Sequence, residues 1–366
     1  MLNKLMILLL IFVLPLYLNA YQLKTRAKQA VILDLASDSF IFEHNADEKF
    51  FPSSMSKLMT LYITFDYLKA GIINMQDKFE VSRKAWKIGG SSMYLKEGQK
   101  VTVEDLLKGA IISSGNDACI TLAEAIAGSE KNFVTEMNEV AQKFNLNNSN
   151  FMNSSGIHNE NHFMSAKDLA KLAQKIFSDF PEYYYLFSEK DFTFNSVEHK
   201  NQNTLIFHNI GVDGIKTGHS DSGDYGIVVS ANQNNKRIFI TINGLGTARE
   251  RIEEAKKLVQ YYFKNFNTRT IFRKNSKIEE IDVLYGQKKK VPITVEKDIV
   301  ITYNRNIFNK IKVYMEYQND VIAPIKKGQE IGKLHIEIPG MEKQVVPLYI
   351  AESIEELGMI GKLFSL

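Results

Sequence analysis

The residues best suited to covalent chemistry in this chain are a serine and a lysine three positions apart. They lie in FPSSMSKLMT, residues 51–60, where Ser54 and Lys57 precede an apolar run. Positions i and i+3 share one face of a helix, so the hydroxyl and the amine can touch. A lysine without its proton can then activate the serine for acyl transfer. Taken alone, the same stretch is typical of a helix start at which Ser53 or Ser54 is only a cap.

Two further polar strings hold other candidate residues. Ser114-Gly115-Asn116 separates two apolar segments with helical spacing, and Lys216-Thr217-Gly218 begins a region with strand character. By itself the first string indicates a turn between helices, and the second an edge strand protected by lysine. The order Ser-x-x-Lys, Ser-x-Asn, Lys-Thr-Gly is typical of serine acyl-transfer enzymes that bind penicillins.

The segments around these strings predict an α+β first domain. An N-terminal hairpin is expected at 31–43, followed by a buried helix at 54–70 that Gly71 ends. Further helices are expected at 102–112, 117–128, 165–177 and 248–266, and two strands within 223–246. Because strands stand at both ends of this region with helices between them, we expect an antiparallel sheet assembled from distant segments and covered by helices.

The chain changes character near residue 268. From Ile271 to about Ala351, short alternating apolar segments are separated by turn residues, which predicts a small all-β sandwich. We therefore expect a first domain over 21–268, a second over 269–351 and a tail over 352–366. Apolar residues recur at helical spacing in the tail, which predicts a short amphipathic segment; the alternative is an end that frays or packs on the second domain.

The first 20 residues predict export from the cytoplasm. Lys4 precedes an apolar stretch that ends at Leu18, and Asn19-Ala20 follow as a cleavage site, as in a secretory signal peptide. The stretch is shorter than the roughly 20 residues of a spanning helix, which favours cleavage over retention as an anchor. The net charge of +3 and the scattered basic residues do not indicate a nucleic-acid partner.

Together these strings resemble the D-alanyl-D-alanine carboxypeptidases of the low-molecular-mass penicillin-binding protein family. The resemblance rests on PSSMSKLMT, SSGNDA and VDGIKTGH in the first domain and APIKKGQEIGKL in the second. It covers nearly everything after the signal peptide, and Ser53 stands where the family usually has alanine. It implies a β-lactamase and D,D-peptidase-like catalytic domain followed by the all-β domain.

The resemblance also implies a role for each candidate residue. Ser54 would attack the carbonyl between two terminal D-alanines, Lys57 would be its base, and Ser114 would relay a proton to the leaving amine. The residues expected to hold the substrate and its developing charge are Asn116, Lys216, Thr217, Gly218, His219 and Arg251. Gly218 would leave room for substrate beside its strand, and Arg251 has a second interpretation as an ordinary surface charge.

A proton acceptor at Lys57 requires an unusual lysine. An ordinary pKa near 10.4 leaves roughly one lysine in 2,500 neutral at pH 7. Burial lowers that pKa, and a second ammonium nearby lowers it further. Lys216 is the candidate for this second cation, so we expect the two lysines to titrate as a coupled pair.

The resulting hypothesis is an exported enzyme of the periplasm or cell envelope. It would remove the terminal D-alanine from peptidoglycan pentapeptide stems, be acylated by β-lactam inhibitors and need no cofactor or metal. His158 and His162 do not form the H-E-x-x-H pattern of a zinc site. The alternatives are a D,D-endopeptidase, a β-lactamase or a cell-wall-binding protein with a vestigial site. The partners would be stem peptides, β-lactams and the outer face of the cytoplasmic membrane.

Overall fold

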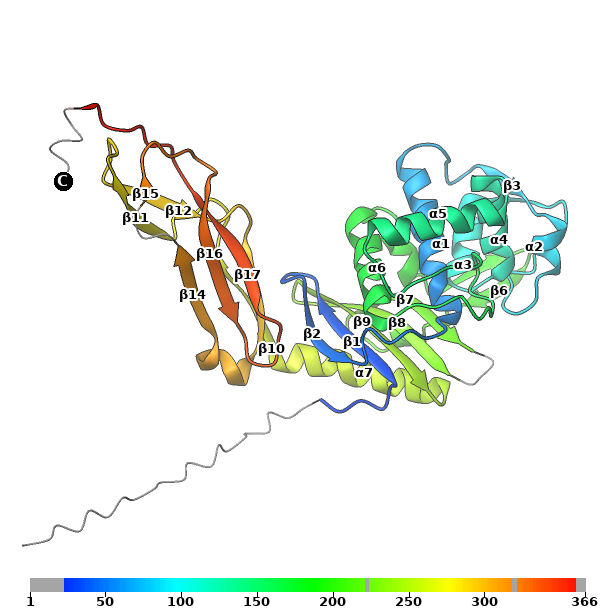
Figure 1. The fold of residues 1–366 in the computed structure, drawn as a ribbon. Coiled ribbons are helices and arrows are strands. Elements are labelled where there is room, and N and C mark those ends of the chain that lie inside the picture. The colour runs from blue at the N-terminus through cyan, green and yellow to red at the C-terminus, as the bar shows by residue number, and fades with distance from the viewer. Residues whose placement is uncertain (1–22, 221–223, 318–320, 360–366) are drawn as a thin grey trace, which may run out of the picture.

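The computed structural model describes residues 23–220, 224–317 and 321–359. These residues form two domains, which Figure 1 shows at opposite ends of a long helix, α7 (Ala248–Asn265). The predicted signal peptide, residues 1–20, lies outside the described residues. Within them, no helix is both long and apolar enough to cross a membrane.

A five-stranded antiparallel sheet forms the base of the first domain. Its strand order is β2-β1-β9-β8-β7, so strands from the start of the chain pair directly with strands more than 200 residues later. The strands are β1 (Gln29–Asp34), β2 (Ser39–His44), β7 (Val212–His219), β8 (Tyr225–Gln233) and β9 (Lys236–Leu245). The predicted sheet of distant segments is confirmed, and β7, which carries Lys-Thr-Gly, is an edge strand.

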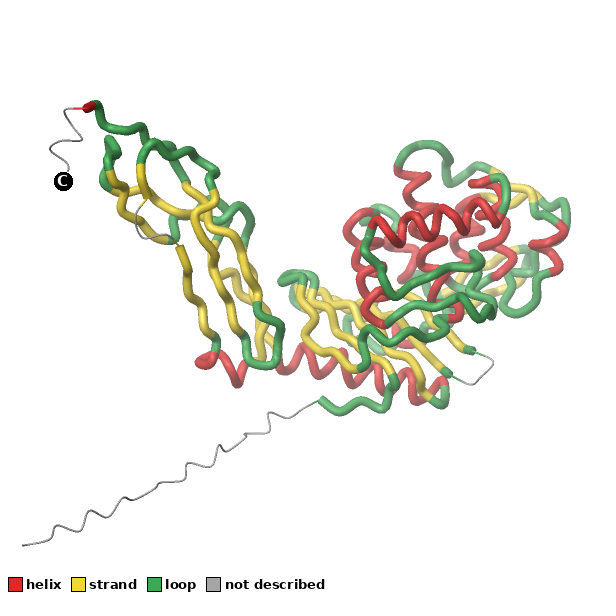
Figure 2. Tube along the Cα trace, viewed as in Figure 1, coloured by secondary structure: helices red, strands yellow, loops and turns green. Residues whose placement is uncertain are grey.

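Helices cover both faces of this sheet, with α7 alone on one side (Figures 1 and 2). The helices on the other side are α1 (Lys57–Lys69), α3 (Val103–Ile111), α4 (Asn116–Ala127), α5 (Glu130–Lys143) and α6 (Ala166–Asp179). Apart from Asp66, Tyr67 and Lys69, every residue of α1 is buried, as the apolar pattern on all its faces predicts. Thr102 caps α3 and Ser165 caps α6, each accepting a backbone N–H three residues on.

Short elements fill the spaces between these helices. They are η1 (Ser53–Ser56), β3 (Lys78–Glu80), α2 (Arg83–Lys87), β4 (Lys100–Thr102), η2 (Tyr184–Ser188), β5 (Asp191–Phe194), β6 (Val197–Lys200) and η3 (Thr204–Phe207). Three of them border the candidate site. η1 leads into α1, α2 precedes the loop beside α4, and η3 lies next to β7 and α7.

The second domain is built almost entirely of strands, as predicted (Figure 2). A six-stranded sheet has the order β14-β16-β17-β12-β11-β15, and β10 pairs with β13. The strands are β10 (Phe266–Phe272), β11 (Glu279–Leu284), β12 (Lys290–Thr294), β13 (Ile299–Asn304), β14 (Lys312–Tyr317), β15 (Val321–Ile322), β16 (Glu330–Glu337) and β17 (Gln344–Ile350), with η4 (Arg305–Lys310) after β13. Their apolar residues enclose one core.

The described part of the predicted tail is attached to this second domain. Ile354 is buried and bridges to Ile325, and Glu356 bridges to Gly286. The helical spacing in the sequence begins at Leu357, and nearly all of it falls on residues outside the described part of the chain. The predicted division between residues 268 and 269 lies inside β10, whose partner β13 belongs to the second domain.

A buried carboxylate connects the two domains. Asp34, the last residue of β1, accepts hydrogen bonds from the Tyr262 hydroxyl of α7 and, at 2.9 Å, from the Thr302 hydroxyl of β13. A second contact runs from Gln344 Nε2 to Ser39 Oγ at 2.9 Å. The second domain therefore packs against the β1–β2 hairpin through polar contacts as well as through the chain connection.

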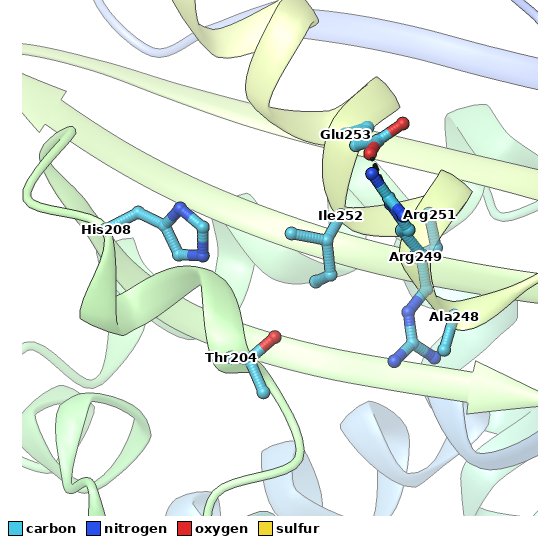
Figure 3. Close-up of a pocket in the computed structure, with 7 residues that line it drawn as sticks. All are labelled: Thr204, His208, Ala248, Arg249, Arg251, Ile252 and Glu253. Carbon is cyan, nitrogen blue, oxygen red and sulfur yellow. Dashed lines mark hydrogen bonds and ion pairs between the residues drawn. The ribbon is translucent and has the colours of Figure 1, made fainter.

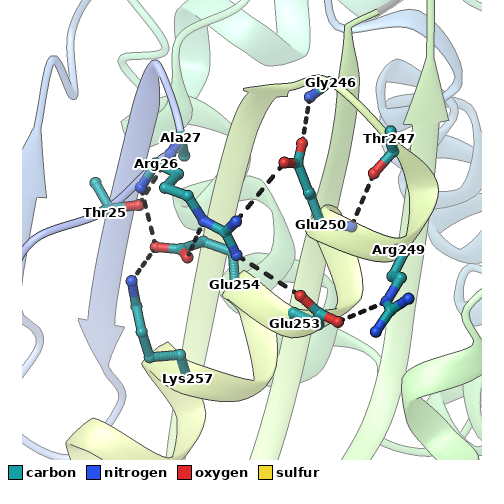
Figure 4. Close-up of polar contacts among 10 residues, drawn as sticks. All are labelled: Thr25, Arg26, Ala27, Gly246, Thr247, Arg249, Glu250, Glu253, Glu254 and Lys257. Carbon is teal, nitrogen blue, oxygen red and sulfur yellow. Dashed lines mark hydrogen bonds and ion pairs between the residues drawn. The ribbon is translucent and has the colours of Figure 1, made fainter.

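Ion pairs attach Arg26, near the start of the described chain, to the N-terminal half of α7. Figure 4 shows the Arg26 guanidinium among three glutamates of that helix, Glu250, Glu253 and Glu254, at 3.6 to 3.7 Å. Lys257 pairs with Glu254 from the other side, at 2.5 Å. These contacts join the segment just before β1 to the N-terminal half of α7, the part that carries Arg251.

Candidate active site

Ser54 lies in η1, a turn of 3₁₀ helix directly before α1. No side chain caps η1 or α1, so the interpretation of Ser53 or Ser54 as a simple helix cap is wrong. Ser53 instead has a positive φ of 51°, which is rare for a residue with a side chain. The turn places the half-buried Ser54 hydroxyl 2.9 Å from the buried Lys57 Nζ, as the i, i+3 spacing predicts.

The Lys57 amine has three hydrogen-bond partners. Besides Ser54 Oγ, it contacts Asn116 Oδ1 at 2.7 Å and the Ser155 carbonyl at 2.5 Å. The amide and backbone carbonyls can only accept, whereas a hydroxyl can also donate. A neutral amine therefore keeps both carbonyl contacts with its two N–H groups and turns its lone pair to the Ser54 O–H. The geometry suits a lysine that takes a proton from this serine.

The pKa of Lys57 fits this arrangement. Burial lowers it from 10.5 to about 8, which leaves about one molecule in ten with a neutral amine at pH 7. The pKa of Lys216 is also lowered well below its usual value, first by burial and then by the Lys57 ammonium. The sequence predicted that Lys216 would depress the pKa of Lys57; in the structure burial is the main cause, and the like-charge effect falls on Lys216.

Ser114 and Lys216 form a second serine–lysine contact. The Lys216 Nζ of β7 lies 2.9 Å from Ser114 Oγ, and both residues are buried. Ser114 has a φ of 60°, in the left-handed region that residues with a side chain rarely adopt. Contacts with the surrounding structure must therefore hold the turn between α3 and α4 in this conformation. This strained turn directs one residue, Ser114, to the edge of β7 and another, Asn116, to Lys57.

The end of β7 borders η1 closely. A Cβ on Gly218 would lie 2.9 Å from the Pro52 carbonyl and 3.0 Å from Met55 Cγ. Glycine is therefore needed here for packing against η1, a reason that the sequence alone did not show. Thr217 is buried with its hydroxyl 3.5 Å from Gln202 Oε1, and His219 is exposed with its ring stacked on Tyr225.

Arg251 is buried, not an ordinary surface charge. It is 8 % exposed, its guanidinium donates to the Gly218 carbonyl at 3.3 Å, and its Nε has no partner among the described residues. Burial lowers its pKa to about 10. Figure 3 shows it beside a pocket of about 410 Å³ between η3 and the start of α7, where Arg249 pairs with Glu253. This pocket shares only Arg251 with the candidate site residues.

Sequence reasoning missed the loop that fixes Asn116. The Asn116 amide donates to the Gly89 carbonyl at 2.8 Å, and its backbone N–H donates to Ser91 at 2.7 Å. Asp117 anchors the same loop by accepting from Ser92 Oγ and from the backbone N–H groups of residues 93 and 95. Backbone partners leave no residue-type signature, so only the adjacent Asn-Asp pair was visible in the sequence.

The histidine-containing loop packs behind the serine. His162 is buried against Phe51 and Phe151, and burial lowers its pKa to about 4, so the ring is neutral at pH 7. Among residues 23–220, 224–317 and 321–359, no group of three or more His, Cys, Asp or Glu is placed to hold a metal. Cys119 is buried in α4.

Two family models match successive parts of the chain. Residues 18–245 match the family model described as D-alanyl-D-alanine carboxypeptidase, and residues 266–356 match that of the penicillin-binding protein 5 C-terminal domain. The chain belongs to the D-alanyl-D-alanine carboxypeptidase family of low-molecular-mass penicillin-binding proteins.

Two relatives match over nearly the whole chain, and a third matches over about two thirds of it. The D-alanyl-D-alanine carboxypeptidase DacC of Escherichia coli (strain K12) is 36% identical over 346 residues, 92% of this chain and 86% of the relative. Penicillin binding protein 5 from Haemophilus influenzae has a TM-score of 0.84 at 35% identity, covering 91% of this chain and 99% of that one. Penicillin-binding protein D2 from Listeria monocytogenes, solved with ampicillin bound, has a TM-score of 0.60 at 27% identity over 65% of this chain and 97% of that one. The family relationship and the α+β plus all-β fold predicted from the sequence are confirmed.

Proposed function

We propose that this protein is a serine D-Ala-D-Ala carboxypeptidase that removes the terminal D-alanine from peptidoglycan pentapeptide stems through an acyl-enzyme on Ser54. The observation that carries the proposal is the Lys57 amine. It lies 2.9 Å from Ser54 Oγ, is fully buried, and has two carbonyl acceptors that leave its lone pair for the hydroxyl proton. The names of the family and of its relatives support the same activity.

The acylation step uses both serine–lysine contacts. Ser54 Oγ bonds to the carbonyl carbon of the terminal peptide bond while its proton moves to Lys57 Nζ. The C–N bond then breaks as the Lys216 ammonium passes a proton through the Ser114 hydroxyl, 2.9 Å away, to the leaving amine of D-alanine. Water next attacks the ester and returns a proton through Ser114 to Lys216. Lys57 gives its proton back to Ser54 Oγ as the stem leaves as an acid.

The positive groups around β7 would hold the substrate. Lys216, Thr217 and Arg251 surround the end of the strand and would bind the chain-ending carboxylate. Asn116 would contact the peptide backbone, and the N–H groups of Ser54 and His219 would stabilise the charge on the attacked carbonyl oxygen. Because these groups would bind a carboxylate at the end of the substrate chain, the site favours cleavage of the last peptide bond, which is an exopeptidase activity.

β-Lactams would acylate the same serine, because they present a strained amide and a carboxylate to the same groups. The ampicillin-bound relative from Listeria monocytogenes supports this part of the proposal. The direct experiment is incubation with a fluorescent penicillin followed by gel electrophoresis. Wild type should carry a covalent label that Ser54→Ala lacks; an unlabelled wild type would refute the proposed nucleophile.

The products of purified muropeptides separate exopeptidase from endopeptidase activity. Release of free D-alanine from pentapeptide monomers, with crosslinked dimers left intact, is the expected result. Cleavage of the dimers at a comparable rate would replace the proposal with a D,D-endopeptidase. A protein that binds muropeptides without releasing D-alanine would be a cell-wall-binding protein.

We further propose that the protein acts outside the cytoplasm, at the outer face of the membrane. The N-terminal sequence has the layout of a signal peptide. At the end of the second domain where the tail leaves, Leu284 and Ile322 lie side by side, 40% and 61% exposed, with Lys289, Lys326 and Lys327 exposed on the adjoining loops. Apolar side chains among lysines favour contact with anionic lipid.

Vesicle co-sedimentation tests this contact. The chain should sediment with phosphatidylglycerol vesicles, and a Leu284→Ser, Ile322→Ser variant should sediment less. Equal sedimentation of the variant and wild type would exclude these side chains as the contact.

A further inference from the structure

Glu130 is a buried acid that the acyl-transfer steps above do not use. It is the first residue of α5 and is only 8% exposed. One carboxylate oxygen accepts from the Ser154 backbone N–H at 2.9 Å and from the Ser154 hydroxyl at 2.7 Å. The other oxygen pairs with Lys84 at 2.6 Å. Because a buried carboxylate needs partners of this kind, Glu130 fixes whatever segment carries them.

The first arm of this network ends at the Lys57 amine. The Ser154 carbonyl accepts from the Thr60 hydroxyl at 2.6 Å, and the next carbonyl, of Ser155, accepts from Lys57 Nζ. Gly156 follows with a φ of 76°, and a Cβ there would lie 2.1 Å from the Ser53 carbonyl. Residues 154–156 are thus confined between α5 on one side and η1 with α1 on the other.

The second arm reaches the other carbonyl partner of Lys57. Lys84 belongs to α2, and the loop after α2 supplies the Gly89 and Ser91 backbone carbonyls that hold Asn116. The Asn116 Oδ1 in turn accepts from Lys57 Nζ. Both carbonyl acceptors of the amine are therefore connected, through different segments, to the same carboxylate.

We propose that Glu130 is a positioning residue for Lys57. Its carboxylate holds the Ser154–Ser155 segment and the loop after α2. The Ser155 and Asn116 carbonyl oxygens then accept hydrogen bonds from Lys57 Nζ, and the remaining position of the amine faces Ser54 Oγ. This inference rests on the proposed function, in which Lys57 is the proton acceptor.

If Glu130 only stabilised its own helix, its carboxylate would have different partners. An acid in the first turn usually interacts with the free N–H groups of its own helix. Here Ser129 caps α5, and both carboxylate oxygens of Glu130 have partners outside that helix. The Glu130 carboxylate thus binds two segments that border the site, residues 154–155 and α2.

The variants Glu130→Ala and Glu130→Gln test the proposal by the second-order rate of acylation with a fluorescent penicillin. Alanine removes both the hydrogen bonds to Ser154 and the ion pair with Lys84. A displacement of about 1 Å in a catalytic site reduces the reaction rate by about 100-fold. We expect a fall of about 10- to 100-fold for alanine. Glutamine still accepts from Ser154, so its fall should be only a few-fold. Equal rates in alanine variant and wild type would overturn the proposal.

The pH profile separates positioning from loss of stability. When the Ser155 carbonyl moves away, the charged amine loses an acceptor, which lowers the pKa of Lys57. In Glu130→Ala the acid limb of the acylation profile should therefore shift to lower pH while the plateau falls. A lower plateau with an unmoved limb would contradict the proposal, because instability alone changes only the amount of folded enzyme.

Further variants keep the test decisive if Glu130→Ala does not fold. Ser154→Ala removes one of the two donors, and Lys84→Met removes the second arm from its exposed end. Both should slow acylation by about 2- to 10-fold. The matched control is Lys167→Met, which breaks a 2.8 Å pair with Glu43 that includes none of the candidate site residues and should leave the rate unchanged. If wild type is acylated and these variants match the control, only the positioning role fails; an unreactive wild type refutes the proposed function itself.

Discussion

The two domains bury different kinds of side chains. The first buries charged residues, among them Lys57, Asp117, Glu130, Lys216 and Arg251. In the second, the buried side chains of residues 266–317 and 321–359 are apolar except for Thr294, Thr302 and His335. Both domains have well-formed sheets, so sheet architecture alone does not explain the difference.

This difference indicates where the chain has given up stability for reactivity. Burying an ammonium is unfavourable, and Lys57 and Lys216 both have pKa values lowered by it. The second domain contains no such buried cation among its described residues and has the composition of a stable support. We therefore expect substitutions to affect acylation in the first domain and stability alone in the second.

The largest effect on acylation is expected from Lys57→Arg. Arginine keeps the positive charge but does not lose its proton, so the Ser54 hydroxyl loses its base. The acylation rate should fall by about 1,000-fold or more. Stopped-flow measurements with a chromogenic cephalosporin provide the rate. Lys69→Arg, at the exposed end of the same helix, is the matched control and should react like wild type.

A smaller effect is expected from Lys216→Met. The variant keeps the base but loses a buried cation that would bind the substrate carboxylate, so kcat/KM for a pentapeptide should fall by about 100-fold. Because burial lowers the pKa of Lys57 and Lys216 is not among the causes, that pKa should be unchanged in this variant. Steady-state release of D-alanine measures the change. A kcat/KM within a factor of three of wild type would remove Lys216 from the carboxylate site.

In the second domain, Leu348→Ala should separate stability from activity. Leu348 is fully buried in the β-rich core, and truncation of such a side chain destabilises its domain by about 2–5 kcal/mol. Urea unfolding should show the loss, while the acylation rate of the folded protein stays within error of wild type. A parallel loss of acylation would show that the second domain shapes the site.

The smallest effect is expected at the contact between the domains. Thr302→Val removes one of the hydroxyls that hydrogen-bond Asp34, at a cost of about 1–3 kcal/mol because the buried carboxylate keeps fewer donors. Thermal unfolding followed by calorimetry should show a lower transition, and the acylation rate should not change. An unaltered transition would mean that this contact does not hold the domains together.

The sequence predicts the fold well because its signals are local. Thr102 and Ser165 are N-caps of helices, and Gly71 follows a helix end. The alternation of apolar and polar residues after residue 271 predicts the β-rich domain. The pairing of Ser54 with Lys57 follows from helical spacing and is confirmed by their contact. The fold and this pair are therefore accessible from residue types and periodicity alone.

The rest of the site depends on backbone groups and long-range contacts that carry no residue signature. The Ser155 carbonyl, which holds Lys57, is a backbone atom from 98 residues away. Gly218 suggested space for substrate, yet its Cβ position is filled by η1, which no local pattern reveals. Arg251 had two interpretations until its burial and its contact with the Gly218 carbonyl were seen. Tertiary packing decided each of these cases.

The most direct test of the account is the pKa of the Lys57 amine itself. The ¹³Cε resonance of Lys57 in lysine-labelled protein can be assigned by its absence in Lys57→Arg and followed from pH 6 to 11. The account predicts a midpoint near 8, the value to which burial lowers it. A midpoint near the usual value of about 10.4 would contradict the claim that a buried, easily deprotonated lysine activates Ser54.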